Sequence, residues 1–228
     1  MIYKLVDKFL MNDFTPIISE IINKQNKIDI NVFDIGCFQG NFSRNLREHI
    51  KIKTNFFLFD ANPNLDIKDF EYTKLAFSNE KGMRDFHLNT FFPASGSSLK
   101  KIISEDKLWN FTWKLITGNL GKKFETFKVQ SDTLDNYCKD NKIEKIDILK
   151  IDTEGSELDI LLGAKNILKN TDVVLVEVMD KKKEFKDKYN NVMEILTKNN
   201  KFQKVFEKNI WSLGTLSGSS ATDILFKK

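Results

Sequence analysis

The chain has 228 residues, of which 41% are hydrophobic and 30% are charged, and its formal net charge is +4. These values are ordinary for a soluble globular protein with one sizeable α/β core, so we expect a single domain over residues 1–228. A charge this small does not indicate a nucleic-acid partner, and none is predicted.

The cysteines and the apolar runs indicate which metal sites, disulfides and membrane segments to expect. Cys37 and Cys138 lie far apart, with no histidines at the spacing of metal ligands, so they predict neither a zinc site nor a disulfide framework. No apolar run approaches the ~20 residues that cross a bilayer, and the first residues lack the core of a signal peptide. We therefore expect a cytoplasmic protein without a membrane span, and the oligomeric state stays open.

Residues 1–28 carry apolar side chains at mixed three- and four-residue spacing, which predicts one or two helices, the second beginning at Pro16. From there on, short apolar runs alternate with amphipathic stretches, as strands alternate with helices in α/β proteins. The predicted strands are residues 31–35, 55–60, 72–77, 146–152 and 172–178. The predicted helices are residues 39–50, a short one opened by Pro63, 156–168 with Ser156 as its cap, and 187–199.

Four further segments predict additional strands. Residues 82–88 and 124–130 alternate and are expected to be antiparallel, and residues 202–206 and 222–226 predict a closing antiparallel hairpin. We therefore expect an open, mostly parallel sheet with helices on both faces. Ligands of such sheets bind beyond the carboxyl ends of the strands. The polar residues that end the predicted strands are thus the candidates for a site: Asp34, Asp60, Ser78, Asp152 and Glu177.

A glycine turn follows the first predicted strand, running from Gly36 to Gly40 with Asp34 just before it. It differs from the dinucleotide fingerprint, because Cys37 and Phe38 stand where the second, close glycine should be. Gly36 lets backbone approach a ligand. The carboxylate of Asp34 suits the ammonium group of an amino-acid moiety, directly or through water. The pattern alone is also compatible with a plain strand–helix turn.

Asp60 ends the second predicted strand, about twenty residues further on, where a carboxylate can accept hydrogen bonds from both hydroxyls of a ribose. A glycine turn with an acid at the second strand indicates a nucleoside. The acid in the first turn favours S-adenosylmethionine over NAD.

With these residues in place, the sequence resembles the FkbM family of methyltransferases over residues 31–226. The resemblance is carried by segments in the same order, the most specific being Asp147 to Leu158, with the sequence Asp-Ile-Leu-Lys-Ile-Asp-Thr-Glu-Gly-Ser-Glu-Leu. The other segments are residues 32–43, 58–63, 75–78, 97–99, 133–135 and 162–164. One departure is Asp60-Ala61, where the family usually has Glu-Pro. Aspartate is one methylene shorter than glutamate but keeps both acceptor oxygens.

The resemblance implies a class I methyltransferase fold, a Rossmann-like, mostly parallel seven-stranded sheet. It also implies S-adenosylmethionine as cofactor, with S-adenosylhomocysteine as product, and O-methylation of a small molecule or a sugar hydroxyl. The acceptor is expected to be a sugar or glycan precursor, or a natural-product precursor. The expected cofactor-binding residues are Asp34, Gly36, Gly40, Asn41, Phe42, Asp60, Ala61, Asn62, Ala76, Phe77, Ser78 and Asp152.

Methyl transfer to a hydroxyl needs alignment of donor and acceptor and one general base. Asp152 is expected to be that base or a substrate-orienting acid, with Glu154 as its partner, and the sequence does not decide between the two as the base. They could also share a divalent cation, but two acids are too few to predict one. Glu157 could have only a structural role, in which its negative charge complements the positive end of the helix that begins there. Lys150 lies inside an apolar strand and should meet a carboxylate, with Asp34 as one candidate.

Residues 89–123 are expected to form a lid over the acceptor. Aromatic side chains there could stack on a sugar, shield the sulfonium by a cation–π contact, or pack the lid on the core. The expected acceptor contacts are Ser97, Ser98, Trp109, Trp113 and Glu177.

Three other functions remain open from sequence. An NAD(P)-binding oxidoreductase is disfavoured by the missing glycine, and a non-catalytic nucleotide-binding module would have the same fold. A nucleic-acid methyltransferase would often carry an Asn/Asp-Pro-Pro-Tyr motif, and the sequence has none.

Overall fold

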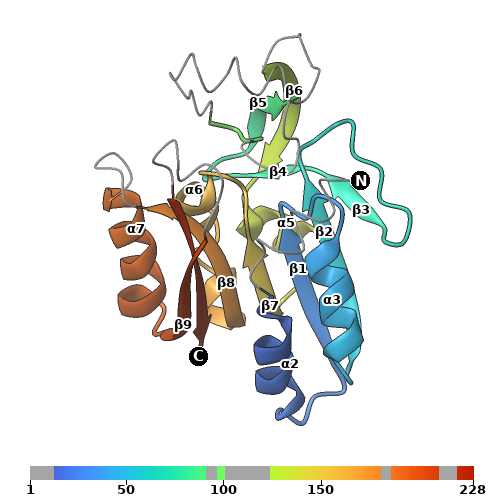
Figure 1. The fold of residues 1–228 in the computed structure, drawn as a ribbon, viewed down its shortest axis with the longest axis vertical. Helices are drawn as coiled ribbons and strands as arrows, with labels where there is room; N and C mark the ends of the chain where they lie inside the picture. The colour runs from blue at the N-terminus through green and yellow to red at the C-terminus, as the bar shows by residue number, and fades with distance from the viewer. Residues whose placement is uncertain (1–12, 91–96, 101–123, 181–185, 211–219) are drawn as a thin grey trace.

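The computed structural model describes residues 13–90, 97–100, 124–180, 186–210 and 220–228. Its centre is a seven-stranded sheet in the order β3-β2-β1-β7-β8-β10-β9 (Figure 1). The strands are β1 (Asp29–Ile35), β2 (Lys53–Asp60), β3 (Tyr72–Lys74), β7 (Ile146–Ile151), β8 (Thr171–Asp180), β9 (Gln203–Ile210) and β10 (Ser220–Lys227). β10 is antiparallel to both of its neighbours, whereas the pairs from β3 to β8 are parallel. The predicted fold class and closing hairpin are confirmed.

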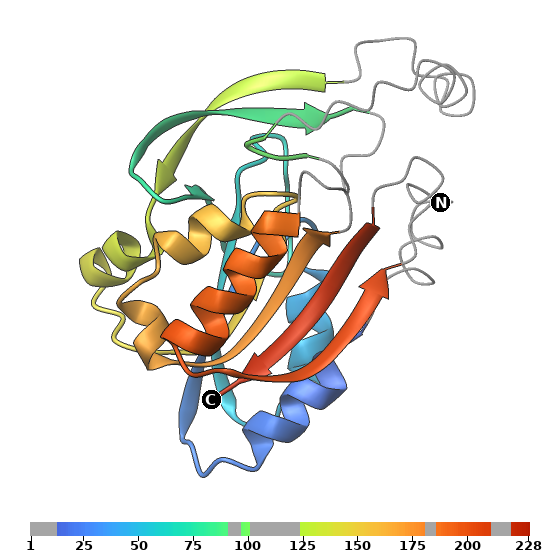
Figure 2. The same cartoon turned by 90° about the vertical axis from the view of Figure 1, so that its left-hand side faces the viewer.

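Helices cover both faces of this sheet (Figure 2). One face is covered by α2 (Thr15–Asn23), which has Pro16 in its first turn as predicted, and by α3 (Asn41–His49). The other face is covered by α5 (Leu134–Asp140), α6 (Glu157–Leu162), a 3₁₀ turn (Ile167–Asn170), α7 (Lys186–Met193) and a π-helical segment (Glu194–Asn199). Among the described residues, no helix has both the length and the apolar character needed to cross a membrane.

The middle of β8 is apolar because helices cover both faces of the sheet there. Val174 and Val176 belong to the core beneath α5, α6 and α7, whereas Val173 and Leu175 belong to the core beneath α2 and α3. Successive side chains of a strand point to opposite faces, so a strand covered on both faces needs no polar alternation. The polar exceptions in such strands therefore need another explanation.

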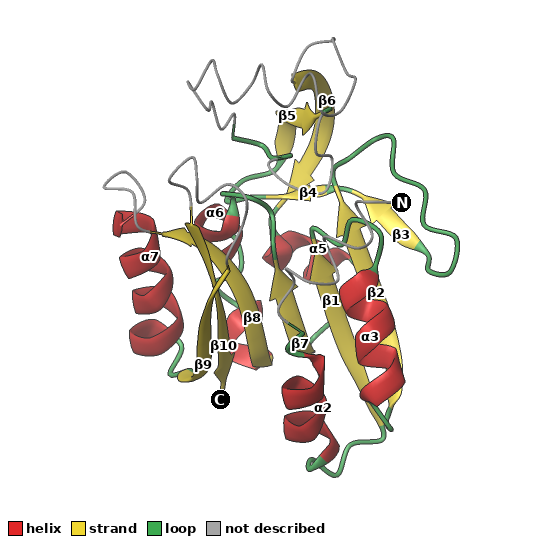
Figure 3. Cartoon of the chain, viewed as in Figure 1, coloured by secondary structure: helices red, strands yellow, loops and turns green. Residues whose placement is uncertain are grey.

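A second, three-stranded sheet stands at the carboxyl end of the large one (Figure 3). It contains β4 (Ala76–Phe77), β6 (Phe124–Asp132) and β5 (Gly82–Asn89), with β5 and β6 antiparallel as predicted. The prediction of one strand over residues 72–77 is wrong, because β3 pairs with β2 while β4 pairs with β6. Phe77 turns into the core, with its ring centroid 4.9 Å from that of Phe59, and this contact draws the chain away from the large sheet.

Two helix predictions also need correction. No helix begins at Pro63, because Asn62 closes a turn there through its carbonyl and its side chain, which accept the N–H groups of Leu65 and Asn64. The helix after Ser156 ends at Leu162 rather than at residue 168. Ser156 takes the N-cap position, but its hydroxyl makes no capping bond and is buried without a hydrogen-bond partner.

Candidate functional site

The turn from Gly36 to Gly40 connects β1 to α3 at the carboxyl edge of the sheet. Gly36 and Gly40 have φ angles of +73° and +76°, which favour glycine. A Cβ atom on Gly36 would lie 1.8 Å from the carbonyl oxygen of Asp152, so backbone from β1 and β7 approaches too closely for a side chain. The N–H groups of Gly36 and Cys37 donate to the carbonyl of Phe59 at 2.9 and 3.1 Å. The turn is thereby tied to both neighbouring strands.

Asp60 lies against this turn, as the sequence predicts. One carboxylate oxygen accepts the N–H of Phe38 at 2.8 Å, and the other accepts the N–H of Asn62 at 2.8 Å. Burial raises the pKa of Asp60, although the two backbone hydrogen bonds oppose that effect. Each carboxylate oxygen has two acceptor sites, so both can accept a further donor. The pair of free acceptor sites fits two adjacent hydroxyl groups.

Asp34 occupies a different environment from the one expected. Its side chain has no exposed surface; one oxygen accepts the Ser43 hydroxyl at 2.7 Å, and the other lies 3.2 Å from the ammonium of Lys150. A fully buried carboxylate cannot meet a ligand directly, so the direct ammonium contact considered for Asp34 is wrong. The predicted pairing of Lys150 with Asp34 is confirmed.

Acidic side chains continue along the carboxyl edge beyond the glycine turn. The register of β7 and β8 pairs Ile151 with Val176, and one further step places Asp152 beside Glu177. Glu177 pairs with Asp223 across β8 and β10. Burial, then the charges of Asp152, Glu154 and Asp223, raise the pKa of Glu177 well above its usual range. The structure therefore brings the predicted acids Asp152, Glu154 and Glu177 together.

Asp223 is the functional candidate that the sequence analysis missed. It lies in the short apolar run predicted as the last strand, and a single acid there was a signal. Its relation to Glu177 depends on the register of two strands far apart in sequence. Hydrophobic pattern alone does not determine which residues face each other across a sheet.

The turn that carries Glu154 is shaped by Glu157. Glu154 and Gly155 have φ angles of +55° and +114°, a strained conformation for the non-glycine residue. One carboxylate oxygen of the buried Glu157 accepts the N–H of Thr153 at 3.0 Å, the hydroxyl of Thr153 at 2.9 Å and the N–H of Gly155 at 2.9 Å. Glu157 therefore holds the turn in place, which goes beyond the helix-start role considered from sequence.

Several predicted cofactor residues make contacts within the protein. Phe42 packs on the core beneath α3, and the side chain of Asn41 accepts a hydrogen bond from Arg44 at 2.8 Å. Asn62, Ala76, Phe77 and Ser78 are buried, and Ala61 is partly exposed beside Asp60. These contacts explain the residue types without a ligand, so a cofactor contact for these positions stays a prediction.

The predicted acceptor residues fall into three groups. Glu177 belongs to the set of acidic side chains at the carboxyl edge that we call the acidic row, namely Asp152, Glu154, Glu177 and Asp223. Ser97 and Ser98 join the edge of β5, where Ser98 exchanges two backbone hydrogen bonds with His87 and is 1% exposed. The hydroxyl of Ser97 accepts the N–H of Asn89 at 3.0 Å. Trp109, Trp113 and most of the predicted lid lie outside the described residues.

A cavity of about 420 Å³ lies next to this serine segment, and Met83, His87 and Asp159 contribute to its lining. Lys100 forms an ion pair with Asp159 of α6 at 2.5 Å, which links the segment to the helix that follows Asp152. Across the described ranges, no group of three or more His, Cys, Asp or Glu side chains has the arrangement to hold a metal ion.

Comparison with known proteins gives three findings. The family model of the methyltransferase FkbM domain matches residues 27–204. The chain is 25% identical over 178 residues to 2-O-methyltransferase NoeI of Sinorhizobium fredii, covering 71% of this chain and 68% of that protein.

Two solved structures are more distant. Precorrin-6y C5,15-methyltransferase from Geobacter metallireducens has a TM-score of 0.45 at 12% identity, covering 97% of this chain and 92% of that chain. Magnesium protoporphyrin IX methyltransferase from Synechocystis, with bound S-adenosylmethionine, has a TM-score of 0.40 at 10% identity, covering 93% and 76%.

Proposed function

Because this chain belongs to the methyltransferase FkbM domain family, we propose that it transfers a methyl group from S-adenosylmethionine to a hydroxyl group of a sugar or another small molecule. The family and the cofactor agree with the sequence prediction. The choice of oxygen as acceptor atom, and of a sugar as substrate, is the further step. It is supported by the acidic row beside the glycine turn and by similarity to a 2-O-methyltransferase.

The cofactor seat rests on the contact between the glycine turn and Asp60. The Phe38 N–H to Asp60 hydrogen bond of 2.8 Å joins the two sequence features that were expected to bind one nucleoside. Asp60 can accept two ribose hydroxyls, and Gly36 lets the turn lie against the backbone of Asp152, where a side chain would clash. Asp152, 27% exposed on its side chain, is the carboxylate best placed for a cationic group of the cofactor.

The chemistry requires this chain to orient a hydroxyl and to accept its proton. When bound, S-adenosylmethionine supplies a methyl group already activated by a sulfonium. As the acceptor oxygen forms its bond to the methyl carbon and the sulfur–carbon bond breaks, the hydroxyl proton passes to a carboxylate. Asp152 is our candidate for that proton acceptor, with Glu154 and Glu177 beside it. A carboxyl with a raised pKa, such as Glu177, is a stronger base than an exposed one.

The acceptor contacts are proposed from position. Glu177 and Asp223 lie in the part of the row away from Asp60, where an acceptor would lie next to the transferred methyl group. Ser97, Ser98, Trp109 and Trp113 remain acceptor contacts by prediction. For Ser98 the buried hydroxyl, which accepts the N–H of Lys100 at 3.2 Å, favours anchoring of the segment.

Calorimetric titration of S-adenosylhomocysteine and of NADH into the purified chain tests the cofactor. We expect S-adenosylhomocysteine to bind, and Asp60→Ala to weaken it by about tenfold or more, since hydrogen bonds to a charged group contribute about 1.5–3 kcal/mol. Binding of NADH alone would favour the oxidoreductase and overturn the proposal.

Incubation of sugars and glycan precursors with S-adenosylmethionine, followed by mass spectrometry, tests the acceptor. A hydroxyl compound should gain the mass of one methylene group. Asp152→Ala should abolish the gain, whereas S-adenosylhomocysteine should still bind, more weakly than to the wild type. Methylation confined to nitrogen or carbon would contradict the choice of a hydroxyl, and a chain that binds the cofactor but shows the same background with and without Asp152 would be a binding module.

A further inference from the structure

Lys150 is the polar exception in β7. All six residues of this strand are buried, and Lys150 is 8% exposed. A buried ammonium costs several kcal/mol of desolvation, and replacing a buried ion pair by apolar residues is often neutral or stabilising. The fold alone therefore does not call for a lysine at this position, and its contacts indicate why it is there.

The ammonium of Lys150 contacts three segments of the site at once. It donates to the carbonyl of Gly36 at 3.0 Å and lies 3.2 Å from a carboxylate oxygen of Asp34 and 3.3 Å from one of Asp152. Gly36 belongs to the proposed cofactor turn, and Asp152 is the proposed proton acceptor. One side chain thus connects the two parts of the site.

The two carboxylates beside Lys150 differ in how far they are exposed. Asp34 is fully buried and also receives the Ser43 hydroxyl, so its carboxylate is held entirely inside the protein. Asp152, by contrast, is 27% exposed on its side chain and lies 3.3 Å from Lys150. Other titratable groups also face this region, namely Asp60 and Cys37 on the turn side, Glu154 and Glu177 on the far side, and Asp223 with Lys208 opposite it on β9.

We infer that Lys150 is a positioning residue that holds the Gly36 carbonyl and the Asp152 carboxylate in place for the cofactor and the acceptor. This inference rests on the proposed function. Asp34 supports this positioning role indirectly, because its buried carboxylate holds the ammonium of Lys150 in place. The sequence analysis predicted only that Lys150 meets a carboxylate.

The test compares the wild type with Asp34→Asn/Lys150→Met, which removes the buried pair together so that no buried carboxylate is left uncompensated. The affinity for S-adenosylhomocysteine is measured by calorimetry, and thermal unfolding is followed on the same samples. We expect the affinity to fall by about tenfold in the double variant with little change in melting temperature, because the Gly36 carbonyl and the Asp152 carboxylate lose the ammonium that they share while no buried charge is left uncompensated.

Lys27→Met is the matched control, because it disrupts a lysine–aspartate cluster at the opposite end of the sheet. It should lower thermal stability without changing the affinity for S-adenosylhomocysteine. If the double variant binds S-adenosylhomocysteine as tightly as the wild type does, the positioning role of Lys150 is overturned and the proposed function stands. If the wild type does not bind S-adenosylhomocysteine at any pH, the proposed function fails and the inference fails with it.

Discussion

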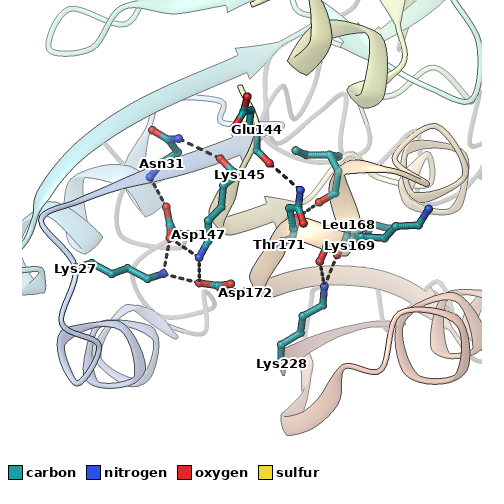
Figure 4. Close-up of polar contacts among 12 residues, drawn as sticks. Lys27, Asn31, Glu144, Lys145, Asp147, Leu168, Lys169, Thr171, Asp172 and Lys228 are labelled. Atoms are coloured by element: carbon teal, nitrogen blue, oxygen red, sulfur yellow. Dashed lines mark hydrogen bonds and ion pairs between the residues drawn. The ribbon is translucent and has the colours of Figure 1, made fainter. Parts of the chain in front are cut away.

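The large sheet carries lysine–aspartate clusters at both of its ends. At the amino end, Lys27 bonds to both Asp147 and Asp172, Lys145 lies 3.0 Å from Asp172, and the N–H of Asn31 donates to Asp147 at 2.7 Å (Figure 4). Two ammonium groups there face two carboxylates, so the charges balance within the cluster.

At the carboxyl end the same residue types are arranged differently. Lys150 meets Asp34 and Asp152, and the row continues to Glu177 and Asp223, so carboxylates outnumber the buried ammonium. Burial and these neighbouring acids raise the pKa of Glu177. The contrast teaches that the amino-end cluster stabilises the fold, whereas the carboxyl end gathers acidic side chains close together at a cost in stability. Such unfavourable arrangements are characteristic of functional sites.

Gly36→Ala should have the largest effect, because it disturbs the carboxyl end where the backbone of β1 and of β7 approach each other most closely. A Cβ atom would lie 1.8 Å from backbone, and the φ of +73° disfavours alanine, so we expect a loss of at least about 2 kcal/mol in unfolding free energy and no binding of S-adenosylhomocysteine. Gly82→Ala is the control, since Gly82 also has a positive φ but no atom within 4 Å of the added Cβ. Normal binding by Gly36→Ala in calorimetry would contradict the proposed seat.

Lys27→Met should show that the amino-end cluster serves stability. Burial alone would lower the pKa of Lys27, but the hydrogen bonds to Asp147 and Asp172 outweigh it and raise that pKa. Its contribution is therefore complete below the unfolded value and is lost as pH rises through the folded value.

At neutral pH, urea unfolding of Lys27→Met should show a loss of about 2–3 kcal/mol, because the substitution leaves two carboxylates with fewer partners. Lys24→Met removes an exposed pair with Glu20 and should change stability by no more than about 0.5 kcal/mol. Equal effects of the two substitutions would remove the distinction between the buried cluster and a surface pair.

Glu177→Gln should stabilise the protein while it impairs turnover. The pKa of Glu177 is raised in the folded state, so the folded protein gains stability from this group as pH falls toward the unfolded value. Above the folded value the glutamine variant avoids a buried charge and should be more stable by about 1 kcal/mol, a common size when a strained site is relieved.

This advantage should shrink as pH is lowered, because the wild-type carboxyl then takes up a proton itself. Unfolding of both proteins across a pH series measures the difference, and the exposed Glu125→Gln should show none of it. A Glu177→Gln variant that is less stable at every pH would mean that the carboxyl end is as well balanced as the amino end.

Arg44→Lys should have the smallest effect. Arg44 donates to both oxygens of Asp69 at 2.9 Å and to the carbonyl of Gln39 at 3.1 Å, which fastens the glycine turn to the segment after β2. Lysine cannot make the paired contact. Affinity for S-adenosylhomocysteine should fall by about fivefold or less, with stability nearly unchanged. Arg84→Lys, which alters an exposed pair with Glu80, should leave that affinity as it is.

The features determined by the sequence itself are local ones. Alternation and periodicity placed β1, α3, β7 and β8 close to their observed bounds, because propensity and side-chain period act over a few neighbouring residues. The glycine turn and Asp60 were likewise predicted to lie together, as they do, and they form the proposed cofactor seat. Lys150 in an apolar strand predicted a carboxylate partner, because a buried ammonium is costly unless it is paired.

Only the tertiary structure decided which charged groups meet. The burial of Asp34, the facing of Glu177 and Asp223, and the departure of β4 from the large sheet all depend on strand order and register between distant segments. A shift of one residue in register moves every side chain to the other face, and nothing in a local pattern specifies that alignment. The sequence thus predicted most of the candidate residues, whereas the balance of charge among them arises from how the strands pair.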